Sequence, residues 1–252
     1  MFPLRDDNPT LGTSVATFAI IGMNIAAWIF VQGLGSEPAL SQSICELGAI
    51  PGDLLGTLPH GTVVPMGQGM SCVIGGDPNW LTPLTSMFLH GGWFHIIGNL
   101  WFLSVFGDNV EDSMGPLRFA LFYVLCGLAA VAVQMFASPG SPVPMVGASG
   151  AISGVMGAYA LLYPRVSVHM LIFLGFFFTR LIVPAWFMLG YWFLLQILGG
   201  IPALEGAGGG VAFWAHVGGF AAGALLIPIF RDPQRIAAHR AHVAMLWARE
   251  RR

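Results

Sequence analysis

Long apolar runs without charged residues constrain this chain more than any other feature. A helix needs about 20 mostly apolar residues to cross the hydrocarbon of a bilayer. Six candidate runs recur along the sequence, at 14–34, 93–107, 119–138, 149–163, 181–198 and 211–230. A seventh stretch, 170–178, is apolar but too short to cross, and we expect it at the interface or packed on the bundle. We therefore predict an all-α, polytopic membrane protein with six transmembrane helices.

The composition agrees with a membrane protein. Hydrophobic residues make up 56% of the chain and charged residues only 9%, whereas a soluble domain carries roughly 25% charged residues. Such a chain cannot cover a water-facing surface, which excludes an ordinary soluble enzyme, a disordered protein and a nucleic-acid-binding protein. The lipid bilayer is therefore a predicted partner.

The arginines set the orientation. All ten basic residues are Arg. With six spans, all ten fall on one side, in the N-terminus, the 108–118 and 164–180 loops and the C-terminal tail, and none falls in the loops 35–92, 139–148 and 199–210. Arg-rich loops stay in the cytoplasm. We predict a short cytoplasmic N-terminus (1–13), a six-helix membrane domain (14–230) with a long outer loop (35–92), and a basic cytoplasmic tail (231–252) that lies on anionic lipid.

Three cysteines are too few for a disulfide scaffold. Cys45 and Cys72 both lie in the long outer loop, and they could form a disulfide if that side of the membrane is oxidising. Two unpaired thiols are an equally open alternative. Cys126 lies in the middle of the third span, where we expect a packing residue.

Polar side chains inside spans are costly and therefore mark candidate functional sites. His95 and Asn99 share one face in the outer half of the second span. Ser149 opens the fourth span, and His216 lies about 7 Å below the outer end of the sixth. Each residue alone has a simpler interpretation as a packing or capping residue. Their common depth favours one shared site.

A serine beside a histidine suggests acyl transfer, because the imidazole can activate the hydroxyl. Asn99, His95 and the backbone N–H of Ser149 could stabilise an oxyanion. No carboxylate lies inside the spans, so the sequence favours a Ser–His dyad over a triad. Small residues on the fourth and sixth spans would let these two helices touch; they are Gly150, Gly154, Gly157, Gly219 and Gly223.

Four stretches resemble the rhomboid family of intramembrane serine proteases. They are GASG at 147–150, AHVGGFAAG at 215–223, HIIGN at 95–99 after FLHGGW at 88–93, and FGDNVEDSMG at 106–115. The resemblance covers roughly residues 10 to 232. It implies a six-helix bundle with a water-filled outer cavity, which cleaves transmembrane substrates near their outer membrane boundary without a metal or cofactor. Single-span or polytopic membrane proteins would be the substrates.

The resemblance also implies residue roles. Ser149 would be the nucleophile and His216 the base, with His95 and Asn99 in the oxyanion site, and Glu111 would be a structural acid. The fifth span would sit at the lateral substrate gate, and the loop 199–210, Gly-rich around 206–210, would be a mobile cap.

Two positions depart from the family pattern. Ser153 stands where an aromatic residue often supports the base, and Trp80 is followed by Leu81 instead of Arg. Neither change removes a catalytic group, so we expect an active enzyme.

Two other functions fit parts of the sequence. His90, His95 and His216 could be metal ligands, although the sequence contains no HExxH motif. A non-catalytic adaptor that binds membrane spans is the other. The absence of Lys and the abundance of Ala, Gly and Arg suggest a bacterium with GC-rich DNA, and hence a bacterial inner membrane.

Overall fold

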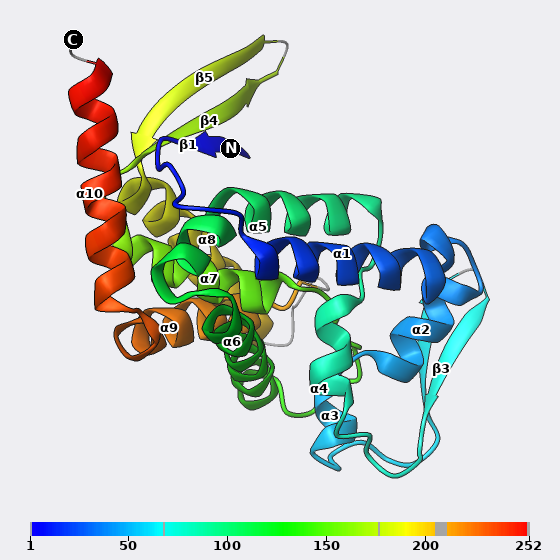
Figure 1. Cartoon of the computed structure of the whole chain (residues 1–252). Coiled ribbons are helices and arrows are strands. Elements are labelled where there is room, and N and C mark those ends of the chain that lie inside the picture. The colour runs from blue at the N-terminus through cyan, green and yellow to red at the C-terminus, as the bar shows by residue number, and fades with distance from the viewer. Residues whose placement is uncertain (1, 68, 176, 205–210, 251–252) are drawn as a thin grey trace.

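The computed structural model describes residues 2–67, 69–175, 177–204 and 211–250, and most of these residues are helical (Figure 1). The helices are α1 (Val15–Phe30), α2 (Ala39–Leu47), α3 (Pro51–Leu54), α4 (Thr82–Thr85), α5 (Trp93–Met114), α6 (Pro116–Ala137), α7 (Ser149–Leu162), α8 (Ala185–Leu204), α9 (Phe213–Phe230) and α10 (Pro233–Glu250). Short 3₁₀ turns lie at Gly33–Gly35 and Ser86–Phe88.

Three helices of the described residues are long and apolar enough to span a membrane: α6, α9 and the Ala185–Pro202 part of α8. Helices α1 and α7 are apolar but shorter. Helix α5 has 22 residues, more than its predicted span, because it continues through the charged segment 108–114. The chain is thus a helical integral membrane protein, and the count of six spans stays a prediction.

The chain is not purely helical, which corrects the expectation of an all-α fold. Strands β1 (Phe2–Asp6), β4 (Ser167–Leu174) and β5 (Phe177–Pro184) form an antiparallel sheet in the order β1-β4-β5. A second hairpin joins β2 (Thr62–Gly67) to β3 (Met70–Ile74). The apolar stretch 170–178 therefore lies in the β4–β5 hairpin, and the helix predicted from 181 begins only at Ala185.

The residue types explain this hairpin. Segment 167–184 is rich in Val, Ile and Phe, which favour strands, and it is interrupted by a glycine. Gly175 has φ +70°, a left-handed conformation that glycine adopts without strain. Figure 1 shows the hairpin and α10 on one side of the helices, with α2, α3 and β3 on the opposite side. This arrangement separates the terminal segments from the long loop that contains the cysteines.

Helix α7 lies at the centre of the bundle, and it is buried from Gly150 to Tyr159. It touches α9 backbone to backbone. A Cβ atom on Gly219 would collide with the carbonyl of Gly150, and one on Gly223 with the carbonyl of Gly154. The close approach expected from the small residues is therefore confirmed, and it brings the start of α7 beside the start of α9.

Glu111 fixes the beginning of α1 on α5. Its carboxylate accepts hydrogen bonds from the backbone N–H of Ala16 at 2.9 Å and of Thr17 at 2.7 Å, and from the Thr17 hydroxyl at 2.8 Å. The first N–H groups of a helix have no partner within it, and a carboxylate there also favours the positive end of the helix dipole. Glu111 therefore holds the start of α1 against α5, in agreement with the structural role expected for it.

Cys45 of α2 and Cys72 of β3 are joined by a disulfide with an S–S distance of 2.00 Å. This bond ties the β2–β3 hairpin to α2. Cys126 is a free, buried thiol, in the packed position expected for it.

Candidate active site

A cavity of about 910 Å³ contains all four residues that the sequence singled out: Ser149, His216, His95 and Asn99. Its walls come from α5, α6, α7, α8, α9 and the segment 138–146 between α6 and α7. Elements far apart in the sequence therefore converge on one space.

Ser149 and His216 are in hydrogen-bond contact. The distance from Ser149 Oγ to His216 Nε2 is 2.8 Å. Ser149 is the first residue of α7, and His216 lies in the first turn of α9. The glycine contacts between α7 and α9 hold these two helix ends at this distance.

Gly147 shapes the approach to Ser149. Its φ of +129° is a conformation that L side chains rarely adopt. A Cβ atom there would lie 2.7 Å from Nε2 of His95. Only glycine therefore allows the chain to turn into α7 while His95 approaches the same place.

The other nitrogen of His216 also has a partner, which the sequence did not reveal. Its Nδ1 lies 2.8 Å from Oε1 of Gln196 on α8. Gln196 in turn donates through Nε2 to the carbonyl of Trp192 at 3.2 Å. An amide oxygen can only accept a hydrogen bond, so this arrangement places the proton of a neutral imidazole on Nδ1. Nε2 is then free to accept the proton of the Ser149 hydroxyl.

A signal for Gln196 was present in the sequence. It is a polar residue near the end of the otherwise apolar run 181–198, and such residues are functional candidates.

Asn99 and His95 offer hydrogen-bond donors to the cavity. The Nδ2 atom of Asn99 is buried and has no partner within the described residues. Nδ1 of His95 accepts a hydrogen bond from the N–H of Gly91 at 3.2 Å, so a neutral His95 carries its proton on Nε2. Nε2 is the atom that lies over Gly147. An unsatisfied buried donor is costly unless a ligand takes it up.

Ser153 does not support the base. Its hydroxyl donates to the carbonyl of Ser149 at 2.6 Å. The aromatic neighbour of His216 is instead Trp192, with ring centroids 5.9 Å apart and planes tilted by 41°. The aromatic contact with His216 thus comes from α8 and not from α7. Trp80, which is followed by Leu81 instead of Arg, is exposed.

The alternative metal site is not assembled in the part of the chain that the structure describes. No three His, Cys, Asp or Glu side chains among those residues gather closely enough to hold an ion. His90 is fully buried and packs edge-on against His95, with ring centroids 5.1 Å apart. Of the cap expected at 199–210, residues 199–204 are instead the end of α8, which corrects that part of the expectation, and residues 205–210 lie outside the described residues.

The fold and the cavity define a helical integral membrane protein with a serine–histidine pair of the kind that serine hydrolases use. The family described as "Rhomboid domain" matches residues 77–233, which is more than half of the chain. The chain belongs to the rhomboid family.

Individual relatives agree with this assignment. The chain is 34% identical over 168 residues to Rhomboid protease GluP of Bacillus subtilis (strain 168), which covers 66% of this chain and 30% of that protein. It is 37% identical over 84 residues to Rhomboid-like protein 11, chloroplastic, of Arabidopsis thaliana, covering 33% and 30%. It is also 36% identical over 76 residues to Inactive RHOMBOID-like protein 8 of the same plant, covering 30% and 21%. The chain thus spans less than a third of the length of each.

Proposed function

We propose that the protein is an intramembrane serine endopeptidase that cleaves transmembrane substrates near their outer membrane boundary. The observation that carries this proposal is the 2.8 Å contact between Ser149 Oγ and His216 Nε2 inside a cavity lined by α5, α7, α8 and α9. Family membership and the relative named as a protease support it.

The geometry suggests the following first half-reaction. His216 Nε2 takes the hydroxyl proton of Ser149 as Oγ attacks the carbonyl carbon of the scissile peptide bond. The carbonyl electron pair moves to oxygen, and the new anion accepts hydrogen bonds from Asn99 Nδ2, His95 Nε2–H and the Ser149 backbone N–H. Protonated His216 then gives its proton to the leaving amine, and the peptide bond breaks.

The second half-reaction uses the same groups. Water attacks the acyl carbon of the ester on Ser149 while His216 accepts a proton from the water. The bond between the acyl carbon and Ser149 Oγ then breaks, His216 returns the proton to Oγ, and the peptide leaves as a carboxylic acid. Every step uses side chains and backbone groups of this chain, and no step calls for a metal or cofactor.

Gln196 acts through His216 as a positioning residue. Its carbonyl oxygen holds the imidazole in the productive tautomer, as the carboxylate does in a triad. A neutral amide stabilises the imidazolium less than a carboxylate does, so this is a dyad with a neutral support.

The placement of the arginines supports a topology with both termini in the cytoplasm, and the composition supports a bacterial inner membrane. Ser149 then faces the external side, where single-span or polytopic membrane proteins would present their cleavage sites.

The adaptor function is the alternative to test, since one relative is named as inactive. Both partners of the dyad are present and in contact here. This favours an active enzyme.

The test is cleavage of a model single-span substrate by the purified chain in detergent or liposomes. Ser149→Ala and His216→Ala should each abolish cleavage. Matched controls are Ser104→Ala, whose hydroxyl bonds a backbone carbonyl on α5, and His242→Ala on α10; both should cleave like the wild type. Cleavage by either site variant would overturn the proposal, and intact substrate with the wild type would favour an adaptor.

A further inference from the structure

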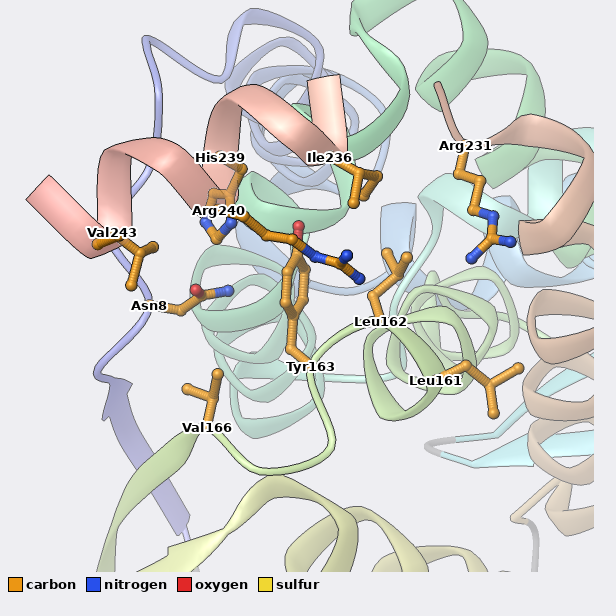
Figure 2. Close-up of a pocket in the computed structure, with 11 residues that line it drawn as sticks. Asn8, Leu161, Leu162, Tyr163, Val166, Arg231, Ile236, His239, Arg240 and Val243 are labelled. Atoms are coloured by element: carbon orange, nitrogen blue, oxygen red, sulfur yellow. The ribbon is translucent and has the colours of Figure 1, made fainter. Parts of the chain in front are cut away.

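A second cavity, of about 390 Å³, lies at the end of α7 that is opposite to Ser149. Helix α7 separates the two sites by about 20 Å, from its length at 1.5 Å per residue. Figure 2 shows how the cavity is enclosed by the end of α7, the turn after α9, α10 and the N-terminal segment. The dyad uses none of these residues.

The polar wall of this cavity carries two arginines, the Asn8 amide, His239 and the Tyr163 hydroxyl. Arg231 follows α9 and Arg240 lies on α10, and both guanidinium groups extend over the end of α7 in Figure 2. Neither forms an ion pair with an acid among the described residues. Burial lowers the pKa of the neighbouring His239, so the two arginines provide the charge.

Asn8 adds a buried donor. It is 8% exposed, it lines the cavity, and its Nδ2 has no partner within the described part of the chain. The nearby His239 is occupied, because its Nε2 lies 3.0 Å from the carbonyl of Pro9. A buried N–H group without a partner costs free energy, and an acceptor bound in the cavity would remove that cost.

The opposite wall is apolar and continues to the lipid-facing surface. Leu162, Val166, Ile236 and Val243 line it, and Leu161 at its edge is 59% exposed. Arg231 and Leu161 lie at the ends of α9 and α7. In the predicted topology this places the cavity at the level where hydrocarbon gives way to headgroups. A ligand that fits both walls has an anionic head and an apolar tail.

We propose that this cavity binds an anionic phospholipid of the leaflet opposite to the Ser149 site. Arg231 and Arg240 pair with the phosphate, the Asn8 amide donates to one of its oxygens, and the first methylenes of the lipid pack on Leu161 and Leu162. The lipid would connect the end of α9, α10 and the N-terminal segment. This inference does not depend on protease activity.

A soluble phosphate shares the headgroup chemistry but would leave the apolar wall without a partner. The polar and apolar walls together therefore favour a lipid as the ligand. A substitution at Ala244 distinguishes a lipid from free phosphate. Ala244 lines the cavity from α10, and Ala244→Trp would fill the apolar part without removing a donor.

The first experiment titrates the purified full chain with phosphatidylglycerol and with phosphatidylcholine, and measures bound lipid by native mass spectrometry. Arg231→Gln with Arg240→Gln should weaken phosphatidylglycerol binding about tenfold or more, since each basic residue near a surface contributes measurably to anionic-lipid attraction. The control Arg165→Gln with Arg249→Gln removes the same charge from exposed positions outside the cavity. It should bind like the wild type, and phosphatidylcholine should bind weakly throughout.

Equal loss in both double variants would overturn the proposal, because it would indicate unspecific attraction to a basic surface. The second variant, Ala244→Trp, should also weaken phosphatidylglycerol binding. It replaces the Arg231→Gln with Arg240→Gln variant as the test if a thermal melt shows that the double variant is not folded. Unchanged lipid binding by Ala244→Trp, together with displacement of the lipid by excess inorganic phosphate, would identify a free anion as the ligand and contradict the lipid proposal.

Discussion

At the scale of single residues, the main feature is how the base is held. His216 contacts Ser149 on one side and Gln196 on the other, each at 2.8 Å. The residues of the dyad could be predicted from the sequence because helix depth places them in one layer. Gln196 could not be derived in this way, since the rotation of α8 that turns it toward His216 depends on packing and not on its position in the span.

Gln196→Leu should lower kcat about tenfold and leave KM nearly unchanged, because a lost hydrogen bond to the base costs roughly 1–2 kcal/mol in the reaction and not in binding. Gln196→Glu keeps an acceptor for Nδ1 and should retain more activity than Gln196→Leu. The measurement is steady-state cleavage of a model substrate.

Leu194→Ala on the same helix is the control, since this side chain is 50% exposed and lies away from the base. A purely structural role of Gln196 would appear as equal losses in Gln196→Leu and Gln196→Glu, with lowered thermal stability in both.

At the scale of elements, two contacts organise the protein. The first is the contact between α7 and α9 through Gly150, Gly154, Gly219 and Gly223, which we call the glycine seam. It could be predicted from the sequence because it follows from the spacing of small residues. The β1-β4-β5 sheet could not, because β1 pairs with a strand more than 160 residues away in sequence, and nothing in segment 2–6 by itself indicates a partner.

Gly219→Ala tests the glycine seam. Its Cβ would meet the backbone carbonyl of Gly150, which cannot move aside, so we expect a loss of about 1–3 kcal/mol in stability and reduced cleavage. Gly22→Ala on α1 meets no atom within 4 Å, and it should be neutral or slightly stabilising because alanine is the better helix former. Thermal unfolding in detergent measures both variants, and equal midpoints would rule out a tight seam.

Strand β1 should dock in a pH-dependent way. Asp6 accepts a hydrogen bond from Tyr159, and burial raises the pKa of Asp6 from 3.8 to about 6, with the Asp7 carboxylate adding in the same direction. The docked strand therefore holds a proton more tightly than the undocked strand. Docking is favoured at low pH and weakens as pH rises from about 4 to 6.

Hydrogen exchange of the β1 and β4 amides, corrected for the intrinsic rates, should show stronger protection at low pH than at neutral pH. Asp6→Asn keeps an acceptor for Tyr159 and should remove this dependence. Asp77→Asn in the outer loop, an exposed position, should leave the dependence intact. Persistence of the pH effect in Asp6→Asn would assign it to another group.

At the scale of the whole molecule, the two cavities lie at opposite ends of α7. We propose peptide hydrolysis at the one that contains Ser149, and binding of an anionic lipid at the one that contains Arg231 and Arg240. The sequence indicated the first through four ordered motifs. The second depends on how α10 folds back over the N-terminal segment, and a sequence pattern alone does not contain this information.

The most direct test of the central claim is covalent labelling of the intact protein with a serine-reactive fluorophosphonate, followed by mass spectrometry of the labelled peptide. A serine activated by a neighbouring base should form one adduct, on Ser149, and His216→Ala should lose it while remaining folded. Absence of an adduct on Ser149 in the wild type, or an undiminished adduct in His216→Ala, would contradict the claim that these two residues form a catalytic dyad.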